Sequence, residues 1–288
     1  MTVTLRIAEV LHLIRVQQWY KNLVVFLALF FSGNLFHFPL FYIIVLTFFS
    51  FCFISSAGYI INDLADRKMD RLHPERKKRP LAAGTIPIST AVVMAILLFL
   101  AGMYLAWKAG MPVVYLAMAL FMLTQLYTFW LKRLVLVDVL TIATLFVIRA
   151  IAGAVAIKVT ISPWLILVPF FLSLFLSVGK RQGDLMMLKE QAGPTRRVLE
   201  QYTTTLTHSL MIMSTTLLII SYALYSFLSP YNRLLYTLPF ALFIIFRFFY
   251  LIITGSIIAR QPELVIHDRQ MVVGMIVWIV VTAGLIYF

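Results

Sequence analysis

Long apolar stretches without charged residues recur along the whole chain, and they constrain its fold more than any other feature. Only 12% of the residues are charged and 62% are apolar, whereas a soluble domain carries about a quarter charged residues. In lipid, backbone polar groups must be satisfied within the protein, which leaves helices or a closed barrel. The stretches are too long and too continuous for barrel strands of alternating polarity. The sequence therefore predicts an all-α polytopic membrane protein.

Nine of these stretches are long enough to be transmembrane helices. They are predicted over residues 16–35, 40–61, 88–107, 113–131, 137–157, 164–179, 208–228, 235–253 and 271–287. The longest charged segments follow the second and sixth stretches, which suggests two four-helix halves plus a ninth helix. We therefore expect a single domain over residues 1–288, in which segments 62–87 and 180–207 are cytoplasmic loops that form one polar site.

Charge predicts the orientation of the chain in the membrane. Most of the 24 Lys and Arg residues lie on the side of the N-terminus, which the positive-inside rule places in the cytoplasm. The net charge of +13 is therefore explained by topology, and no nucleic-acid partner is expected. All eleven Asp and Glu residues lie on or near the same side, although the positive-inside rule predicts little about the placement of acidic residues. This distribution predicts a multi-pass membrane protein with its active site on the cytoplasmic side.

Three carboxylates follow the second predicted span in the sequence NDLADRKMD of residues 62–70. If the helix continues, Asp63, Asp66 and Asp70 lie within about 60° of one another. Carboxylates gathered on one face repel each other unless a cation joins them, and Mg²⁺ prefers such hard oxygen ligands. The motif therefore predicts a Mg²⁺ site, with these three residues as ligands and catalytic groups. The alternative is a solvated segment whose acids pair with neighbouring cations, Arg67, Lys68 and Arg71.

A cluster of cations follows the acids, in the sequence RLHPERKKRPLAAG of residues 71–84. A metal together with Arg and Lys suits a diphosphate leaving group, because negative charge builds on its oxygens as the bond breaks. Arg79, between the cluster and a proline, is the better candidate for this role. For Lys77 and Lys78, positive-inside topology explains the charge equally well.

The acidic motif followed by RPLAAG resembles the UbiA superfamily of intramembrane prenyltransferases, and the resemblance covers essentially the whole chain. It implies nine helices and a diphosphate substrate bound through Mg²⁺ by two Asp-rich motifs, on helices two and six. Here the sixth span ends in GKRQGD, residues 179–184, with one acid and two cations. Asp184 would remain as a second metal or water ligand, and Lys180 and Arg181 replace the other acids.

Three departures from the general pattern resemble one branch of the superfamily, the decaprenyl-phosphate 5-phosphoribosyltransferases. They are the poorly acidic second motif, the sequence RVQQWYKN at residues 15–22, and Pro262-Glu263 followed by Asp268-Arg269. The resemblance implies that ribose 5-phosphate moves from phosphoribosyl diphosphate to a polyprenyl phosphate, with release of diphosphate. Such a site holds three phosphate-bearing groups, so cations should outnumber acids in it.

Polar residues at this membrane face and within the spans complete the candidate substrate-binding set: Lys21, Asn22, Asn62, Arg67, Arg76, Arg79, Tyr127, Lys132, Arg149, Lys180, Arg181 and Asp184. Lys180 and Arg181 are expected to face water at a span end and to bind phosphate. Three alternatives stay open. Tyr127 can be an interfacial residue, and Lys180 can simply pair with Asp184. Charges within spans usually face the bundle interior, so Arg149 and Arg247 are either acceptor-phosphate ligands or structural.

In the expected reaction, a polyprenyl phosphate oxygen attacks C1 of an oxocarbenium-like ribose, and the prenyl tail leaves sideways into the bilayer. The nucleophile is already anionic, so no general base is required. One alternative keeps the superfamily but uses a prenyl diphosphate donor and an aromatic or lipid acceptor. Another is a secondary transporter, although the acids cluster at one face and not at the midplane. The oligomeric state and the prenyl length stay open.

Overall fold

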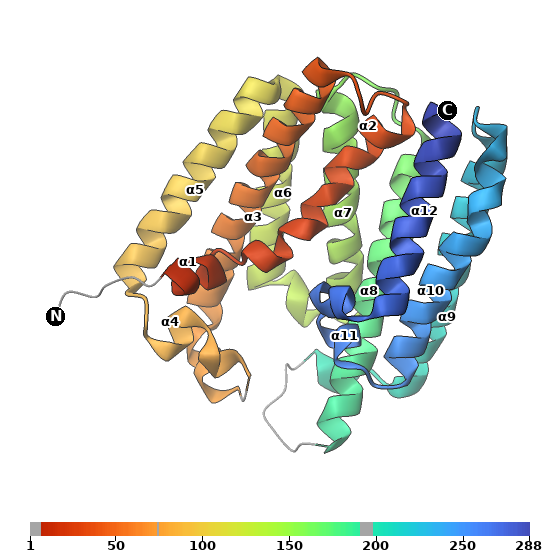
Figure 1. Cartoon of the computed structure of the whole chain (residues 1–288). Coiled ribbons are helices and arrows are strands. Elements are labelled where there is room, and N and C mark those ends of the chain that lie inside the picture. The colour runs from red at the N-terminus through yellow and green to blue at the C-terminus, as the bar shows by residue number, and fades with distance from the viewer. Residues whose placement is uncertain (1–6, 74, 191–197) are drawn as a thin grey trace.

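The computed structural model describes residues 7–73, 75–190 and 198–288, and these residues are almost entirely helical. The longer helices run side by side, while α1, α4 and α11 lie toward one end of the bundle (Figure 1). In chain order the elements are α1 (Ile7–Leu13), η1 (Val16–Phe26), α2 (Leu27–Phe31), α3 (Phe38–Leu72), η2 (Arg76–Lys78), α4 (Pro80–Ala83), α5 (Ile88–Ala109), α6 (Met111–Phe129), η3 (Leu131–Arg133), α7 (Val137–Ala156), α8 (Pro163–Glu190), η4 (Leu199–Gln201), α9 (Thr204–Leu228), η5 (Asn232–Thr237), α10 (Leu238–Ile253), α11 (Ile257–Arg260), η6 (Pro262–His267) and α12 (Arg269–Tyr287).

Eight helical segments in the described part of the chain are long and apolar enough to cross a membrane. They are α3, α5, α6, α7, α8, α9, α10 with all but the first residue of η5, and α12. This confirms the all-α polytopic prediction and eight of the nine predicted spans. Helix ends follow the sequence closely where breakers mark them, as at Gly110, which separates α5 from α6.

The first predicted span, residues 16–35, is a broken helical segment. It consists of η1, an 11-residue 3-10 helix, and the short α2. Lys21 and Asn22 lie in the middle of η1, and Asn22 is buried and donates to the Cys52 sulfur at 3.3 Å. Polar side chains that have specific partners inside the protein are not expected in a regular, uniformly apolar transmembrane helix. The total of nine spans and the division into two four-helix halves stay predictions.

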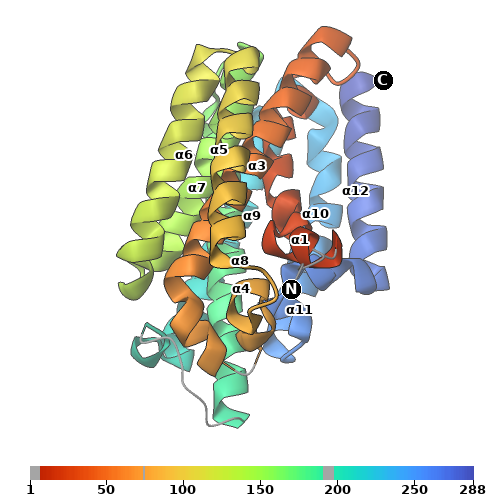
Figure 2. The ribbon, with the colours of Figure 1, turned by 90° about the vertical axis from the view of Figure 1, so that its left-hand side faces the viewer.

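Helices α3 and α8 are longer than a bilayer requires. They contain 35 and 28 residues, about 52 and 42 Å at 1.5 Å per residue, against a hydrocarbon core of about 30 Å. Segments 62–87 and 180–207, predicted as charged loops, therefore begin as helix, while residues 191–197 lie outside the described residues. Because both polar ends project from the same end of the bundle (Figure 2), they can contribute to one site.

Two apolar cores stabilise the bundle on either side of this site. The first joins η1, α2, α3, α5, α6 and α7, and the second joins helices α8 to α12. Helix α7 contributes to both, through Leu145 to the first and Val139 to the second. The position of α7 therefore determines how the two cores meet.

Segment η1 packs directly on α7 because Gly153 has no side chain. A Cβ on Gly153 would lie 1.9 Å from the carbonyl oxygen of Val25, far inside contact distance. The two backbones can therefore touch, and this contact brings the polar residues of η1 against the interior face of α7.

Replacing Gly153 with Ala should destabilise the protein. Overpacking typically costs about 1–3 kcal/mol, which outweighs the roughly 0.5–1 kcal/mol that Ala gains over Gly in a helix. The thermal unfolding midpoint in detergent measures the effect. Gly284→Ala in α12 is the matched control, since no heavy atom lies within 4 Å of the added Cβ, and it should not lower the midpoint. An equal midpoint for Gly153→Ala and the unmodified protein would contradict the close contact.

Candidate active site

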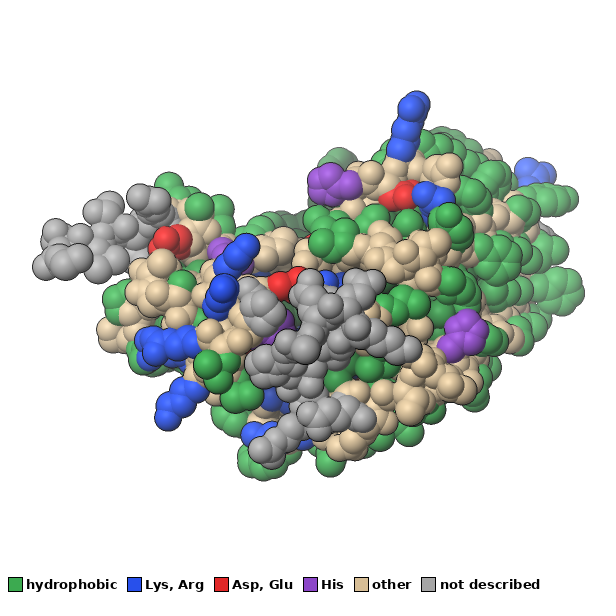
Figure 3. All heavy atoms as spheres, turned by 90° about the horizontal axis from the view of Figure 1, so that it is seen from below, with side chains coloured by type: hydrophobic (Ala, Val, Ile, Leu, Met, Phe, Trp, Pro, Cys, Tyr) green, Lys and Arg blue, Asp and Glu red, His purple; other side chains and the backbone are tan. Residues whose placement is uncertain are grey.

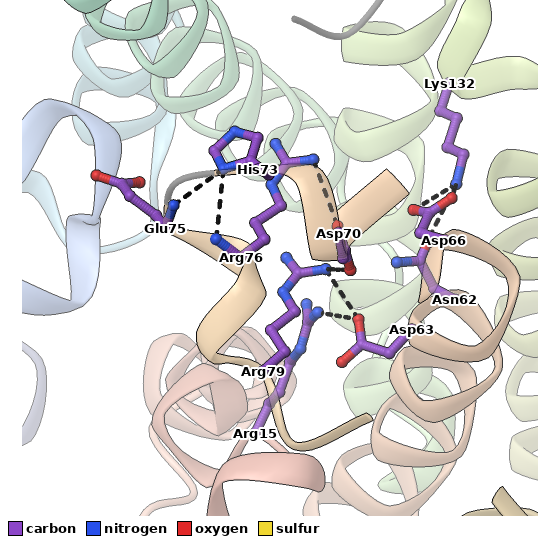
Figure 4. A network of polar contacts seen from close by, with 10 residues as sticks. All are labelled: Arg15, Asn62, Asp63, Asp66, Asp70, His73, Glu75, Arg76, Arg79 and Lys132. Carbon is purple, nitrogen blue, oxygen red and sulfur yellow. Dashed lines mark hydrogen bonds and ion pairs between the residues drawn. The ribbon is translucent and has the colours of Figure 1, made fainter. Parts of the chain in front are cut away.

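Cations from other elements neutralise the acidic end of α3. Arg79 donates through Nη1 to Asp63 Oδ1 at 3.0 Å and to Asp70 Oδ2 at 2.6 Å. Arg15 also donates to Asp63, and Arg76 Nη1 lies 3.9 Å from Asp70 Oδ1. Figure 4 shows these guanidinium groups converging on the two buried carboxylates. In the described part of the chain, the acids thus pair with cations outside α3.

The backbone explains how Arg79 and Arg15 reach these acids. Arg79 precedes Pro80, which favours extended backbone at the preceding residue, and its φ and ψ of −65° and 141° are extended. Arg15 has a left-handed backbone, with φ 53° and ψ 52°, at the start of η1. A non-glycine residue rarely adopts this conformation, and such residues cluster at functional sites. Its guanidinium carbon lies 5.0 Å from the centre of the Tyr59 ring.

Asp66 has a different partner from Asp63 and Asp70. Lys132 Nζ, in η3, lies 2.7 and 2.8 Å from its two carboxylate oxygens and 3.2 Å from Asn62 Oδ1 (Figure 4). The helix is continuous, as predicted, but the three side chains diverge because each follows its nearest cation. Within residues 7–73, 75–190 and 198–288, no three Asp, Glu, His or Cys side chains are grouped as metal ligands.

The neighbouring arginines of α3 hold the next segment in place. Arg67 Nε donates to the Leu81 carbonyl at 2.9 Å, and Arg71 Nε donates to the Ala82 carbonyl at 3.1 Å. These bonds attach α4 to α3 and so position Arg79. The described contacts of Arg67, a predicted substrate-binding residue, are structural.

At the end of α8, Arg181 forms a buried ion pair. Its Nη2 and Nε lie 2.9 and 3.0 Å from Asp138 Oδ2, and the Tyr202 hydroxyl donates to Asp138 Oδ1 at 2.7 Å. Asp138 is fully buried and Arg181 is 3% exposed. The prediction that Lys180 and Arg181 both face water is therefore right for exposed Lys180 and wrong for Arg181, because the carboxylate of α7 draws Arg181 inward.

Arg260, in α11, joins the two protruding helix ends. Its Nη2 lies 2.8 Å from Glu75 Oε2, after α3, and its Nε lies 3.2 Å from Asp184 Oδ1, in α8. Arg181 Nη1 is 3.8 Å from Asp184 as well. Asp184, the predicted second ligand, thus lies across the site from the α3 acids and is held by cations.

These elements enclose a cavity of about 680 Å³. Among the described residues, three acidic side chains line it, Glu75, Asp184 and Glu263. Nine basic ones do so: Arg15, Lys21, Arg76, Lys78, Arg79, Arg149, Lys180, Arg181 and Arg260. From this end of the molecule, Lys and Arg side chains also outnumber acidic ones at the surface (Figure 3). Asp63, Asp70 and Asp138, just behind the wall, pair with Arg15, Arg79 and Arg181, and the described cations of the site still outnumber its acids.

Most of the predicted site residues belong to this cavity wall. It includes Lys21, Asn62, Arg76, Arg79, Tyr127, Arg149, Lys180, Arg181 and Asp184. Four further candidates lie just behind the wall and contact it, Asp63, Asp70, Asn22 and Lys132, and Asp66 binds Lys132. The exception is Arg67, which is directed to α4.

The two arginines within spans differ in their surroundings. Arg149 is 5% exposed and lines the cavity, where its Nε donates to Asn22 Oδ1 at 2.6 Å and its Nη1 to the Leu145 carbonyl at 2.7 Å. Arg247 lies outside the cavity wall and binds Asp268 at 2.8 Å, the residue that caps α12 through Met271 N. The described contacts of Arg247 are thus with the cap of α12, whereas those of Arg149 lie on the cavity wall.

Titratable groups around the site respond to burial and to its positive charge. Burial, reinforced by the Arg15 charge, lowers the pKa of His12. Burial and the Arg76 charge lower the pKa of His73, whose Nδ1 accepts from the Glu75 and Arg76 backbone N–H groups at 3.2 and 3.3 Å. Both shifts favour the neutral imidazole.

Two important residues were not among the sequence candidates. Arg15 begins the RVQQWYKN segment of residues 15–22, of which only Lys21 and Asn22 were selected as candidates. Arg260 was counted only as a positive-inside charge, and no local pattern distinguishes it. Its partners lie 76 and 185 positions away, a separation that only the tertiary structure bridges.

Comparison with known proteins agrees with this geometry. The model of the UbiA prenyltransferase family matches residues 22–255. The chain belongs to the UbiA prenyltransferase family. Among UbiA relatives, decaprenyl-phosphate phosphoribosyltransferase from Mycolicibacterium smegmatis is 32% identical over 293 residues, covering 96% of this chain and 91% of the relative. The protein of the same name from Mycobacterium tuberculosis is 31% identical, with 98% and 95% covered.

The UbiA fold is also evident in solved structures. A UbiA homolog from Archaeoglobus fulgidus, solved with GPP and Mg²⁺ bound, superposes with a TM-score of 0.72. The alignment covers 97% of this chain and all of that structure, at 17% sequence identity. The arrangement of helices around the cavity is therefore that of the UbiA family.

Arg181→Ala should destabilise the protein strongly, because it leaves the Asp138 carboxylate buried without its cation. Breaking such a pair typically costs about 3–5 kcal/mol, whereas replacing both partners by apolar groups is often close to neutral. Unfolding followed in detergent checks this, with Lys180→Ala as the matched exposed control, expected to change stability by less than about 0.5 kcal/mol. The double variant Asp138→Leu, Arg181→Met should recover much of the loss. Equal stability of Arg181→Ala and Lys180→Ala would contradict the buried pair.

Proposed function

We propose that this protein transfers ribose 5-phosphate from phosphoribosyl diphosphate to a polyprenyl phosphate and releases diphosphate. The observation that carries the proposal is the cavity wall, in which nine cations face three acids. The donor brings a diphosphate and a monophosphate, and the acceptor brings another monophosphate. A neutral aromatic acceptor would leave much of this positive charge uncompensated. The relatives named decaprenyl-phosphate phosphoribosyltransferase support the same substrates.

The donor diphosphate is assigned to the polar end of the cavity. Arg15, Arg76 and Arg79 meet there beside the α3 acids. Guanidinium groups bind phosphate oxygens through paired N–H donors and remain charged at neutral pH. They would hold the diphosphate in place and stabilise the charge that develops on it as the glycosidic bond breaks.

A divalent cation fits the same end by the chemistry of its donors. Arg79 Nη1 already lies between carboxylate oxygens of Asp63 and Asp70, so these two acids converge on one positive charge. Carboxylate oxygens are ligands that Mg²⁺ prefers. Asp63 and Asp70, with Asp66 and Asp184 as further ligands, would hold Mg²⁺. When bound, it supplies positive charge to the diphosphate oxygens.

In the proposed reaction, the bond between ribose C1 and the diphosphate oxygen breaks, and its electron pair leaves with the diphosphate. An oxygen of the polyprenyl phosphate forms the new bond to C1 from the opposite face, so the anomeric centre inverts. The nucleophile is an anion and gives up no proton, so no protein base is needed. The protein contributes positioning and charge. Leu145, Phe146 and Leu176 give the cavity an apolar wall beside which the prenyl chain can lie.

The cavity is proposed to open to the cytoplasm. The polar ends of α3 and α8 carry the charged segments of the chain, and the positive-inside rule places such segments on the cytoplasmic side of a multi-pass protein. The donor, which is water-soluble, would enter from that side.

Purified protein incubated with labelled phosphoribosyl diphosphate, Mg²⁺ and a polyprenyl phosphate should produce a labelled lipid. The assay separates this proposal from the alternatives, because a prenyl diphosphate-dependent enzyme would leave the ribose label in water. A transporter would catalyse no transfer at all. Transfer of a prenyl group to an aromatic acceptor, with no ribosyl transfer, would disprove the proposal.

Asp63→Asn and Asp66→Asn should each nearly abolish turnover while the protein stays folded. Losing a charged ligand beside the leaving group removes several kcal/mol of transition-state stabilisation, which corresponds to roughly a thousandfold or more in kcat. Turnover at limiting Mg²⁺ is the measurement, and circular dichroism reports folding. Glu9→Gln is the matched control, since Glu9 lies outside the cavity wall. Full activity of either Asp variant at limiting Mg²⁺ would contradict the metal assignment.

A further inference from the structure

The cations of the cavity occupy two levels. At the polar end, Arg15, Arg79 and Arg181 are each bound to a carboxylate. Arg149 lies deeper, 11 residues beyond Asp138 along α7, or about 16 Å at 1.5 Å per residue. Lys21, on η1, adjoins Asn22, whose Oδ1 accepts from Arg149 Nε, and Glu263 of η6 lies on the same cavity wall. Lys21 and Arg149 therefore form a separate, deeper pair of cations on the cavity wall.

No described carboxylate lies within 4 Å of either deep cation. Arg149 is bound by neutral groups, Asn22 Oδ1, the Leu145 carbonyl and, at 3.3 Å, Ser55 Oγ. In the described structure Lys21 has no hydrogen bond, and its Nζ lies 5.9 Å from the centre of the Tyr20 ring. Arg149 is buried among these neutral partners, and a buried charge without an adjacent counter-charge is costly. An anion in the cavity would remove that cost.

A third polar group at similar depth lacks a partner. Ser173 is fully buried and lines the cavity, and its hydroxyl oxygen has no hydrogen-bond partner in the described structure. It precedes Arg181 by eight residues on α8, about 12 Å. Because Arg181 binds Asp138, and α7 and α8 run in opposite directions from that point, Ser173 and Arg149 lie on the same deep part of the wall. An unsatisfied hydroxyl there points to a polar ligand.

The contacts that hold η1 against α7 do not involve Lys21 or Ser173. Asn22 orients Arg149, and the backbone contact at Gly153 holds η1 against α7. Neither contact uses Lys21 or the free hydroxyl of Ser173. Three donors from η1, α7 and α8 thus line the same cavity, and of the acidic side chains on its wall Glu263 acts on Lys21.

We infer that Lys21 and Arg149, with Ser173, form a second anion site that binds a phosphate monoester, distinct from the diphosphate site at the polar end. The inference rests on the proposed function, which supplies two such groups, the acceptor's phosphate and the donor's 5-phosphate. Either would place a doubly acidic group against the two cations. The remaining phosphate would then be held by the wall nearer the polar end.

Equilibrium binding to the purified full-length protein tests the inference with two probes, farnesyl phosphate and ribose 5-phosphate. Lys21→Met is the decisive variant, because it breaks no described hydrogen bond. We expect it to lower the affinity for one of the two probes by roughly ten- to a hundredfold, the usual loss for a charge-assisted phosphate contact. The probe that is affected identifies the source of the phosphate. Lys21→Arg, which keeps the charge, should bind more tightly than Lys21→Met.

Two controls make the result decisive. Lys108→Met removes an exposed cation outside the cavity wall and should leave both affinities unchanged. Farnesol lacks the phosphate, so its binding should be the same in Lys21→Met and in the unmodified protein. Unchanged affinity of Lys21→Met for both phosphate probes, or an equal loss for farnesol, would overturn the inference. If the unmodified protein binds the probes but transfers no ribose 5-phosphate, the proposed function fails and the anion site stands.

Discussion

The contact of Arg79 with Asp63 and Asp70 is the interaction on which the rest of the site depends. Two buried carboxylates, seven residues apart on one helix, would repel each other at low dielectric without a shared cation. Arg79 supplies that cation from the segment that follows α3, and Pro80 holds its backbone extended. Arg15 adds a second cation from the N-terminal segment. The pairing folds the charged segment back over the cavity and brings η1 to the same place.

Ion pairs between different elements also hold together the rest of the site. Asp66 and Lys132, Asp138 and Arg181, and Asp184 and Arg260 are each drawn from different elements. Two of these ion pairs link elements that also pack against each other through an apolar core, α7 with α8 and α8 with α11. The surplus of cations that remains on the cavity wall is then available to anionic substrates.

The broken segment η1 gives the cavity its depth. A regular transmembrane helix in this position would have placed Lys21 and Asn22 against lipid or against the apolar faces of neighbouring helices. Instead, η1 lies against Gly153 of α7, with Asn22 bound to Arg149. A polar, irregular segment inside the membrane is tolerated only where the segment is buried in protein or lines a cavity. Both conditions hold here.

The sequence by itself determined the membrane class, eight of the spans and the polar end of the molecule, because each depends on local hydropathy that no tertiary contact overrides. It also predicted Asp63, Asp66, Asp70, Arg79 and Arg149 as candidate site residues, which the structure gathers at or just behind one cavity wall. It could not show that Asp66 binds Lys132 while its neighbours bind Arg79, or that Arg181 is buried against Asp138. These outcomes depend on which helices pack together and on how far each charge is removed from water. Partners such as Arg15 and Asp63 are 48 positions apart, so only the tertiary structure decided which charges compensate one another and which face the cavity.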